Sequence, residues 1–470
     1  MMHITSKVSS KLVLITLSFL GINAGLMGQS ISAGLDFTMM VCENEAVSTC
    51  GNNTNGQLGN GANVTSYTPV VVGFNLTDVI AVSAGGEHSL ALKSDGTLKA
   101  WGRNSFGELG TNGSDYIEEN PLNVIGLTNV ISISAGYNAS IALTADGNIW
   151  TWGINDYGQL GQGNNLDLAV PTMVSGMSNV RQISMQAQHT LILKSDSTVW
   201  STGRNNNGQL GHGNIVSTNT FAQVVGLDSV KIVAISANRF HSLILTNDGY
   251  VLSFGYNSSG QLGSGNTIVS AIPDTVIELQ DVIQISEGSD FSMALKSDST
   301  VWMWGRNNSG QLGNGETTTS PNTVPTQVIG LSQVVEISAG DRHCIAKKAD
   351  GSNWVWGSAA SGTLGSGNST NSLVPIEITP FCGSITSLEE TSESNFSIFP
   401  NPTSGIVNIR VNDLQIEGQI FIYNMLGQEV LNSAMSSNYS SLDLSYLPKG
   451  VYYTIFQLNG SFLQKKLVLN

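Results

Sequence analysis

The strongest constraint on the fold is a glycine-rich motif that recurs seven times at a nearly constant spacing. One copy reads GRNNNGQLGHG and runs from Gly203 to Gly213. Successive copies begin 51, 51, 50, 52, 50 and 52 residues apart, at Gly51, Gly102, Gly153, Gly203, Gly255, Gly305 and Gly357. So regular a repeat predicts seven similar structural units that pack against one another. The motif does not have the sequence of a phosphate-binding loop, because no Lys-Ser or Lys-Thr pair follows its glycines.

Each unit has the pattern of four short strands. In ISAGDRHCIAKKADGSNWVWG, from Ile337 to Gly357, one apolar strand ends at Ala-Gly, a second runs to an Asp-Gly turn, and a third ends at Trp-Gly. A further extended run, such as TPVVV from Thr68 to Val72, follows the glycine motif. Four strands with glycine turns are typical of a propeller blade, whereas helical solenoids would show a period of about 3.6 residues. We therefore predict an all-β chain with a seven-bladed β-propeller over residues 29–381.

The ends of the repeat region predict how the ring closes. The region begins at SISAG, from Ser30 to Gly34, and stops at VPIEIT, from Val374 to Thr379. In this interpretation the first copy starts inside a unit, so each end of the repeat region lacks the part of a unit that the other end carries. We expect the N-terminal and C-terminal strands to share one blade, which would hide the sheet edges that an open array exposes.

The segment HSLALKSDGTLKAWGRNSFGELG, from His88 to Gly110, closely resembles the regulator of chromosome condensation repeat. The resemblance covers residues 30–380 and implies the propeller fold. Similar repeats serve as a nuclear exchange factor, a plant ultraviolet photoreceptor and secreted bacterial inhibitors of β-lactamase, so the fold alone does not select a function. Nucleotide exchange is not expected, because an exported protein does not meet the nuclear GTPase.

Three columns of equivalent positions have both a chemical and a structural interpretation. The tryptophans before the motif glycine resemble the photoreceptor's light antenna, but Thr, Ser and Lys interrupt them, which favours packing between blades. The histidines, one per blade, would be dispersed around a ring rather than converge on a metal. The aspartates of the Asp-Gly turns are expected to form turns, not catalytic pairs. The columns comprise Trp101, Trp152, Trp304 and Trp356; His88, His189, His241 and His343; and Asp95, Asp146, Asp248 and Asp350.

The positions that vary between copies give the binding prediction. The frame of each motif, an Asn and a Gly-x-Leu-Gly run, stays nearly fixed, while the residue after the first glycine and the residue three positions later change. Arg and aromatic side chains at such positions anchor many protein interfaces. A solvated loop without a partner is the alternative at each position. The candidate partner-binding residues are Arg103, Phe106, Tyr157, Arg204, Tyr256 and Arg306.

The sequence contains no G-x-S-x-G, G-x-x-x-x-G-K-[ST] or H-E-x-x-H motif. These are the common signatures of a nucleophile elbow, a nucleotide-binding loop and a zinc protease. We therefore predict no catalytic, cofactor-binding or metal-binding residue, and no cofactor.

A polar, acidic segment over residues 382–395 ends the repeat region and is interpreted as a linker. Residues 396–470 then alternate apolar and polar side chains between turns, which predicts a small immunoglobulin-like β-sandwich. Their ordered motifs, Pro-Asn-Pro-Thr, Ile-Tyr-Asn, Gly-Val-Tyr and the terminal Lys-Leu-Val-Leu, resemble the type A C-terminal sorting domain of the type IX secretion system. The sorting-motif residues are Pro400, Asn401, Pro402, Gly405, Gly427, Gly450 and Lys466.

This second resemblance implies export by the type IX secretion machinery of a Bacteroidota-type bacterium, removal of the tail, and either release or attachment to surface lipopolysaccharide. An ordinary adhesive sandwich is the alternative. Export also agrees with residues 1–28, where Lys7 and Lys11 precede a short apolar run and small residues follow, as in a secretory signal peptide. The run is short for a bilayer span, so no transmembrane segment is expected after cleavage.

Charge and cysteine content narrow the partners and the compartment. The chain has 34 Asp and Glu against 19 Lys and Arg, a net charge of −15, which disfavours nucleic acid as a partner. Four cysteines follow the signal, and in an exported protein they permit one or two disulfides without fixing the pairing. They are Cys42, Cys50, Cys344 and Cys382.

These observations predict an exported, non-enzymatic propeller, released or held at the outer cell surface, that recognises a protein or glycan through loops on one face. One alternative is a secreted enzyme inhibitor like the β-lactamase-binding propellers. Another is a surface hydrolase or lyase with its site in the central channel, which would require carboxylates or a histidine pair to converge there.

Overall fold

The computed structural model describes residues 29–73, 76–380, 396–411, 418–424, 429–435, 437–458 and 461–470. The chain forms two compact units, one within residues 29–380 and the other within residues 396–470. The predicted signal peptide at 1–28 and the linker at 382–395 lie outside the described residues. In the part of the chain that is described, no helix is long and apolar enough to cross a membrane.

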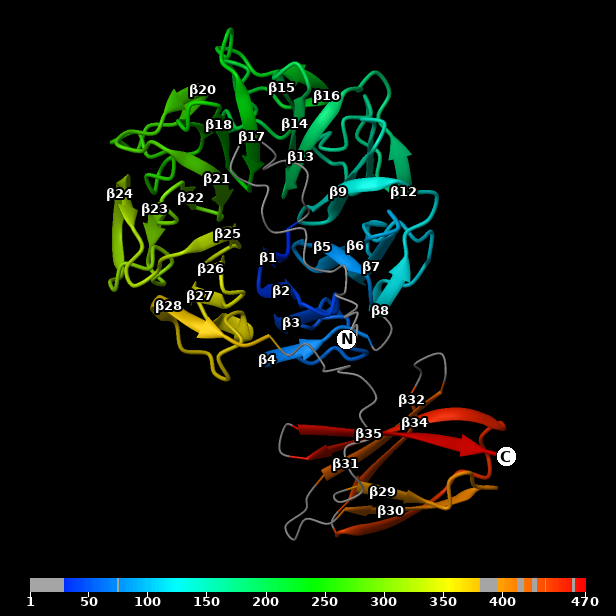
Figure 1. The fold of residues 1–470 in the computed structure, drawn as a ribbon. Coiled ribbons are helices and arrows are strands. Elements are labelled where there is room, and N and C mark those ends of the chain that lie inside the picture. The colour runs from blue at the N-terminus through cyan, green and yellow to red at the C-terminus, as the bar shows by residue number, and fades with distance from the viewer. Residues whose placement is uncertain are drawn as a thin grey trace, which may run out of the picture. The chain divides into compact units, whose positions relative to one another are not determined.

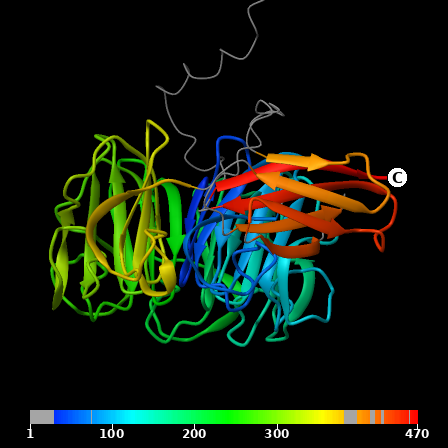
Figure 2. The same cartoon turned by 90° about the horizontal axis from the view of Figure 1, so that it is seen from below.

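The first unit is a ring of seven four-stranded antiparallel sheets, blades 1 to 7, as the repeat predicts (Figure 1). In each blade the strands follow one another from the inside of the ring outward, and they run across the thickness of the ring (Figure 2).

Blades 1 to 4 comprise β1 (Ile31–Ala33), β2 (Phe37–Val41), β3 (Val47–Gly51) and β4 (Ser66–Val71); β5 (Val79–Ala84), β6 (His88–Lys93), β7 (Leu98–Arg103) and β8 (Ile117–Asn123); β9 (Val130–Ala135), β10 (Ala139–Thr144), β11 (Ile149–Gly153) and β12 (Leu168–Met173); and β13 (Val180–Gln186), β14 (His189–Lys194), β15 (Val199–Gly203) and β16 (Thr218–Gln223). Blades 5 to 7 comprise β17 (Ile232–Ala237), β18 (His241–Thr246), β19 (Val251–Gly255) and β20 (Ser270–Thr275); β21 (Val282–Glu287), β22 (Phe291–Lys296), β23 (Val301–Asn307) and β24 (Thr318–Gln327); and β25 (Val334–Ala339), β26 (His343–Lys348), β27 (Asn353–Gly357) and β28 (Ser372–Ile378).

The prediction that the two ends of the repeat region share one blade is wrong. Blade 1 consists of β1–β4 alone and blade 7 of β25–β28 alone. The segment SISAG forms the innermost strand of blade 1 instead of the middle of a unit, so the region starts and stops at unit boundaries. Each blade is therefore one uninterrupted stretch of chain.

Hydrogen bonds to side chains between the innermost strands of blades 1 and 7 close the ring, in place of the predicted shared blade. The backbone N–H of Ala33 donates to Ser338 Oγ at 3.0 Å, which joins blade 1 to blade 7. The equivalent bond between blades 2 and 1 runs from the backbone N–H of Ala84 to Ser32 Oγ at 2.9 Å. Glu336 adds a second link at the closure, because its carboxylate accepts the N–H of Ser30 at 2.7 Å. The first and last blades are thus held together much as any other pair of neighbours is.

The core of the ring lies between blades, where the alternating apolar residues of the middle strands pack together. The indoles of the predicted tryptophan column are fully buried there. Each indole Nε1 donates to a carbonyl oxygen of the preceding blade, as Trp101 does to Gln57 at 2.9 Å and Trp304 does to Gln261 at 2.8 Å. The interpretation of this column as packing between blades is confirmed.

The second unit is a two-sheet β-sandwich, as predicted. One sheet has the order β29-β30-β33 and the other β32-β31-β34-β35, and their facing side chains form one core that includes Val407, Ile409, Ile420, Ile422 and Leu467. The strands are β29 (Phe396–Phe399), β30 (Ile406–Val411), β31 (Gly418–Asn424), β32 (Glu429–Met435), β33 (Tyr439–Asp443), β34 (Gly450–Leu458) and β35 (Ser461–Leu469).

The cysteines do not form two disulfides. Cys50 and Cys344 are free and buried in the ring, whereas Cys42 is disulfide-bonded and Cys382 lies outside the described residues. Burial raises the pKa of the Cys50 thiol to about 12, which keeps it protonated and unreactive at neutral pH.

Candidate functional site

The candidate site is one end of the ring, the end at which the second strand of each blade begins and the third strand ends. We call it the loop face. The backbone N–H after each motif glycine donates to the residue that precedes the second strand, as Arg103 does to Glu87 and Arg204 does to Gln188. Because this bond recurs in every blade, all seven glycine motifs lie at the same end of the ring.

The structure places the six predicted partner-binding residues on the loop face, each half-buried. Arg103 forms a salt bridge with Glu87, and its guanidinium lies 5.7 Å from the ring centre of Phe106. Arg306 pairs with Asp290 through Nη1 and Oδ2 at 2.9 Å. These side chains are held in place by their own neighbours, so they present a defined surface rather than mobile tips.

Arg204 differs from the other two arginines of this column. Its guanidinium lies 5.1 Å from the ring centre of Tyr157 in the neighbouring blade, and its Nη1 donates to Gln188 instead of a carboxylate. Tyr256 in the next blade packs edge-on against Phe240, with ring centres 5.8 Å apart. Blades 3 to 5 therefore present the aromatic rings of Tyr157 and Tyr256 beside Arg204, whose positive charge is not paired with any described carboxylate.

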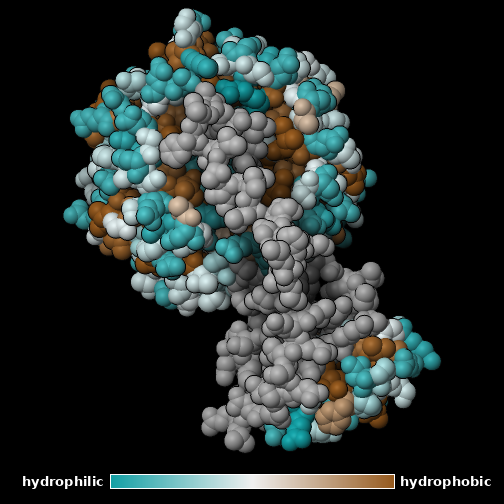
Figure 3. Space-filling model, in the orientation of Figure 1, coloured by the Kyte–Doolittle hydropathy of each residue, from teal (hydrophilic) through white to brown (hydrophobic). Residues whose placement is uncertain are grey.

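An outer rim of exposed apolar residues surrounds these positions, and the sequence interpretation missed it. The residues stand in the loop that leads into the fourth strand, and they are about 70% exposed in five of the seven blades. They are Val64 at 70%, Tyr116 at 72%, Leu166 at 69%, Val216 at 69% and Ile268 at 73%. Figure 3 shows such apolar residues scattered among polar ones around the ring. The signal in the sequence was an apolar residue within an otherwise Asn-, Ser- and Thr-rich loop.

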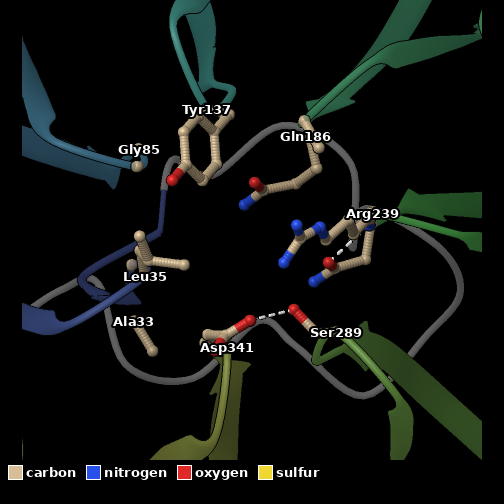
Figure 4. Close-up of a pocket in the computed structure, with 13 residues that line it drawn as sticks. Ala33, Leu35, Gly85, Tyr137, Gln186, Arg239, Ser289 and Asp341 are labelled. Atoms are coloured by element: carbon tan, nitrogen blue, oxygen red, sulfur yellow. Dashed lines mark hydrogen bonds between the residues drawn. The ribbon is translucent and has the colours of Figure 1, made fainter.

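The mouth of the central channel opens at the centre of the loop face as a shallow, solvent-open hollow (Figure 4). The residues that line it come from the turns between the first and second strands of the blades. Gln186 and Arg239 extend into it from one side, and Asp341 and Ser289 face them from the other (Figure 4). Ser289 Oγ and Arg342 Nε both donate to the Asp341 carboxylate. The mouth is therefore polar and carries both signs of charge.

The predicted histidine column lies between blades, away from the mouth. His88 Nε2 lies 2.9 Å from Ser140 Oγ of the next blade, and that hydroxyl donates to Glu108 O at 2.8 Å, so the imidazole is the donor. Burial lowers the pKa of these imidazoles, to about 3 for His88, His189 and His241 and to about 4 for His343. The four rings occupy four separate interfaces, which confirms the structural interpretation of this column.

The aspartates of the turns are exposed and bind their own turn. Asp95 Oδ1 accepts the N–H of Thr97 at 2.9 Å, and Asp350 Oδ1 accepts that of Ser352 at 3.0 Å. The hydroxyls of Thr97 and Ser352 donate to the same oxygens at 2.6 Å, and these hydroxyl bonds, followed by the backbone bonds, lower the pKa of both carboxyls. Within the described ranges, no group of three or more His, Cys, Asp and Glu side chains is placed to hold a metal ion.

The sorting-motif residues lie at the edge of the sandwich beside the last strand. Asn401 Oδ1 accepts the N–H of Val468 at 2.9 Å, and Thr403 pairs with the same strand, its N–H donating to Val468 O at 2.9 Å. The Thr403 hydroxyl also accepts the N–H of Gly405 at 3.2 Å. The Pro-Asn-Pro-Thr segment and the terminal strand are thus one structural element. Gly450 and Lys466 belong to the paired strands β34 and β35, and Gly427 lies outside the described residues.

Family models match both units. The model described as the RCC1-like domain matches residues 21–277, and two models of the regulator of chromosome condensation repeat match residues 282–311 and 298–346. The model described as the secretion system C-terminal sorting domain matches residues 397–470. Both resemblances found in the sequence are confirmed.

Among curated relatives, the ultraviolet-B receptor UVR8 of Arabidopsis thaliana is 28% identical over 353 residues, which is 74% of this chain and 69% of the receptor. The probable E3 ubiquitin-protein ligase HERC6 of Homo sapiens is 35% identical over 135 residues, 28% of this chain and 13% of the ligase. The E3 ubiquitin-protein ligase HERC2 of Homo sapiens is 30% identical over 257 residues, 54% of this chain and 4% of the ligase. The chain thus spans a small part of either ligase.

Solved structures show the same fold. Prp20p from Saccharomyces cerevisiae has a TM-score of 0.65 at 23% identity over 80% of this chain and 92% of that one. Human WBSCR16 has a TM-score of 0.63 at 23% identity over 69% of this chain and 92% of that one. The repeat, the seven blades and the match over more than half of the sequence agree: this chain belongs to the RCC1-like domain family and carries a C-terminal sorting domain.

Proposed function

We propose that this protein is an exported, non-enzymatic binding propeller whose loop face recognises a partner protein. The observation that carries the proposal is the composition of that face. Arginines stacked on aromatic rings stand inside a rim of apolar side chains, each about 70% exposed. Exposed apolar groups around Arg and aromatic anchors are typical of protein interfaces, in which the rim excludes water from the anchors.

A glycan remains the second class of ligand for the same face, since aromatic rings and guanidinium groups also bind sugars. The apolar rim favours a protein, because Leu166, Val216 and Ile268 offer no hydrogen-bonding group to a hydroxyl-rich ligand. The dispersal of the histidine and aspartate columns, one per blade, supports a binding role over a hydrolase or lyase.

The C-terminal unit supplies delivery. The match to a secretion sorting domain indicates export of the Bacteroidota type IX kind, consistent with an extracellular or surface location. We propose that residues 396–470 are handled by the type IX machinery, and that the propeller is then released or attached to surface lipopolysaccharide. Deletion of residues 396–470 in the native host tests this proposal: the propeller should disappear from the medium and the cell surface, and unchanged levels there would refute it.

The binding proposal is tested by capture from the organism's surroundings with the chain from residue 29 as bait. Alanine at Arg103, Tyr157, Arg204 and Arg306 should abolish capture. Serine at the rim residues Leu166, Val216 and Ile268 should weaken it. Lys231 is exposed ahead of β17, at the opposite end of the ring, so Lys231→Ala is the control and should leave capture unchanged. Capture that survives all seven substitutions on the loop face would show that the partner binds elsewhere.

A further inference from the structure

Three polar side chains line the channel mouth and form no side-chain hydrogen bond with any described residue. Tyr137, Gln186 and Arg239 come from the consecutive blades 3, 4 and 5, and Gln186 and Arg239 extend into the hollow (Figure 4). The guanidinium of Arg239 lies 4.9 Å from the ring centre of Phe240. Among the described residues, none forms a hydrogen bond with that guanidinium, with the Gln186 amide or with the Tyr137 hydroxyl. Together the Gln186 amide and the Arg239 guanidinium offer several N–H donors to the hollow, and the Tyr137 hydroxyl adds an O–H donor at its edge (Figure 4).

On the opposite side of the mouth, a series of backbone hydrogen bonds joins the neighbouring blades 7, 1, 2 and 3. Leu35 N donates to Gly85 O at 3.2 Å, Gly86 N to Gly136 O at 3.0 Å, and Asp341 N to Gly34 O at 3.1 Å. The glycines are required by this close approach. A Cβ on Gly340 would lie 2.3 Å from Gly34 O, and one on Gly85 would lie 2.5 Å from Gly136 O.

Blades 4 and 5 interrupt this series of hydrogen bonds, because Gln186 and Asn238 occupy the position at which the other blades have glycine. A side chain at this position does not fit the closed arrangement, so the backbone bonds are given up and the mouth opens on this side. The residue after Gln186, Ala187, has a φ of 35°, which is strained for a residue with a Cβ. Strain that persists in one blade of a repeat is characteristic of a functional position.

We infer that the open side of the channel mouth binds a carboxylate, supplied by an Asp or Glu side chain on a projecting loop of the partner protein. Arg239 is the principal ligand and forms charge-assisted hydrogen bonds, Gln186 donates a further one, and Tyr137 covers the site. A carboxylate is a planar acceptor of two hydrogen bonds, and a guanidinium has the matching geometry. The mouth's own carboxylate, Asp341, accepts hydrogen bonds from Ser289 and Arg342 and forms no ion pair with Arg239, which leaves the Arg239 guanidinium for a partner's carboxylate.

A protein side chain is favoured over a free acid by the surroundings of the mouth. The hollow lies at the centre of the loop face, inside the apolar rim, so a partner that covers the rim would project a side chain into it. This inference rests on the proposed function, since it names the chemistry by which the same face selects its partner.

The experiment uses the full chain from residue 29 and a random-peptide phage library as the probe. Selected peptides should contain an Asp or Glu whose replacement by Asn or Gln lowers affinity about 10- to 100-fold, the effect of losing a charge-assisted hydrogen bond. Arg239→Gln should cause the same loss, Gln186→Ala a smaller one, and the charge-matched control Lys231→Gln none. Because no described residue forms a hydrogen bond with the Arg239 guanidinium, Arg239→Gln should shift Tm by no more than about 2 °C.

The outcomes separate this inference from the proposed function. Peptides that lose affinity on alanine substitution at Arg103 and Arg204 but tolerate both Arg239→Gln and removal of their carboxylate would support the loop face and overturn the carboxylate site. Selected peptides that tolerate every one of these substitutions would overturn both. Glutarate serves as the small-molecule arm. Binding of free glutarate as tight as that of the peptides, and lost in Arg239→Gln, would assign the mouth to a small acid and overturn the assignment to a partner's side chain.

Discussion

The imidazole Nε2 of His343 lies 2.9 Å from the hydroxyl of Thr38, across 305 residues of sequence, where blade 7 meets blade 1. Thr38 passes the hydrogen bond on by donating to Thr363 O at 2.8 Å. The same relay joins His88 to Ser140 and His241 to Ser292 inside the ring. The closure of the ring is thus one more copy of an interface that the repeat already contains.

Thr38→Val should destabilise the ring at its closure. The substitution keeps the shape but leaves the His343 N–H buried without a partner, and it leaves the Thr363 carbonyl only the weak Cys50 Sγ donor at 3.7 Å. The loss costs roughly 2–3 kcal/mol of unfolding free energy. Urea unfolding of the full chain measures the loss. The double variant Thr38→Val/His343→Phe should recover part of it, since both polar partners at the bond are then gone and Phe already occupies this column at Phe37 and Phe291. An unchanged midpoint for Thr38→Val alone would contradict the relay.

Acid should unfold the ring through its buried histidines. The folded pKa of about 3 for His88, His189 and His241 lies below the value of about 6.5 for an unfolded histidine. Their contribution to stability is therefore complete above about pH 6.5 and is lost as the pH falls toward 3, at up to about 1.4 kcal/mol per pH unit for each imidazole. Burial raises the pKa of Glu287 and Asp36, which acts in the opposite direction and reduces the slope.

Urea unfolding at several pH values between 7 and 4 measures this slope. His241→Phe recreates the Phe37 and Ser89 pair found between blades 1 and 2 and removes one titrating group, so it should flatten the slope by about one histidine's share. A slope equal to that of the unaltered chain would show that His241 does not titrate on unfolding.

The free thiols should be silent in the folded protein. Cys50 and Cys344 are fully buried, and burial raises the pKa of both. A thiol reagent such as dithionitrobenzoate, added without reductant at pH 8, should label neither residue in the native chain and both in denaturant. Labelling of all four cysteines in denaturant would show that the disulfide of Cys42 is reduced.

Asn401→Ala should impair export by loosening the sorting element. The substitution leaves the N–H of Val468 without its side-chain acceptor and costs about 1–2 kcal/mol in the small sandwich. The fraction of chain recovered outside cells of the native host reports the effect. The control is Asn408→Ala, which removes a hydrogen bond of similar length with the Tyr439 hydroxyl on a different strand. Equal export of both variants would separate the Asn401 contact from sorting.

The blades were predictable because each is encoded locally. The strand, turn and glycine signals for one blade all lie within one repeat, so each of the seven copies predicts the same structure independently. The prediction of ring closure was wrong because it depends on where the first unit begins. Ile31 was assigned to the interior of a unit, and this assignment required the two ends of the repeat region to share a blade. The bond between Ala33 and Ser338 that closes the ring involves residues far apart in sequence and gives no local signal.

The candidate site was predictable in part. Comparing equivalent positions found Arg204 and Tyr157, because they vary within a fixed frame. The comparison missed Leu166 and Val216, since single apolar residues in loops are common and their exposure is known only from the structure. Gln186 and Asn238 were visible as departures from a glycine column. The significance of that column follows from the close approach of neighbouring backbones, since a Cβ at Gly34, Gly85 or Gly340 would lie 2.3–2.7 Å from a carbonyl oxygen of the adjacent blade.

The confinement of each blade to one stretch of chain has a consequence for topology. No strand is exchanged at the junction of blades 1 and 7, and apart from the added Glu336 contact this junction is built like those between other neighbouring blades. A circular permutant with a linker from residue 380 to residue 29 and new termini in the loop at Gly330, where a Cβ would meet nothing within 4 Å, would therefore retain all seven sheets. Whole blades are also units that gene duplication adds or removes without re-pairing a single strand.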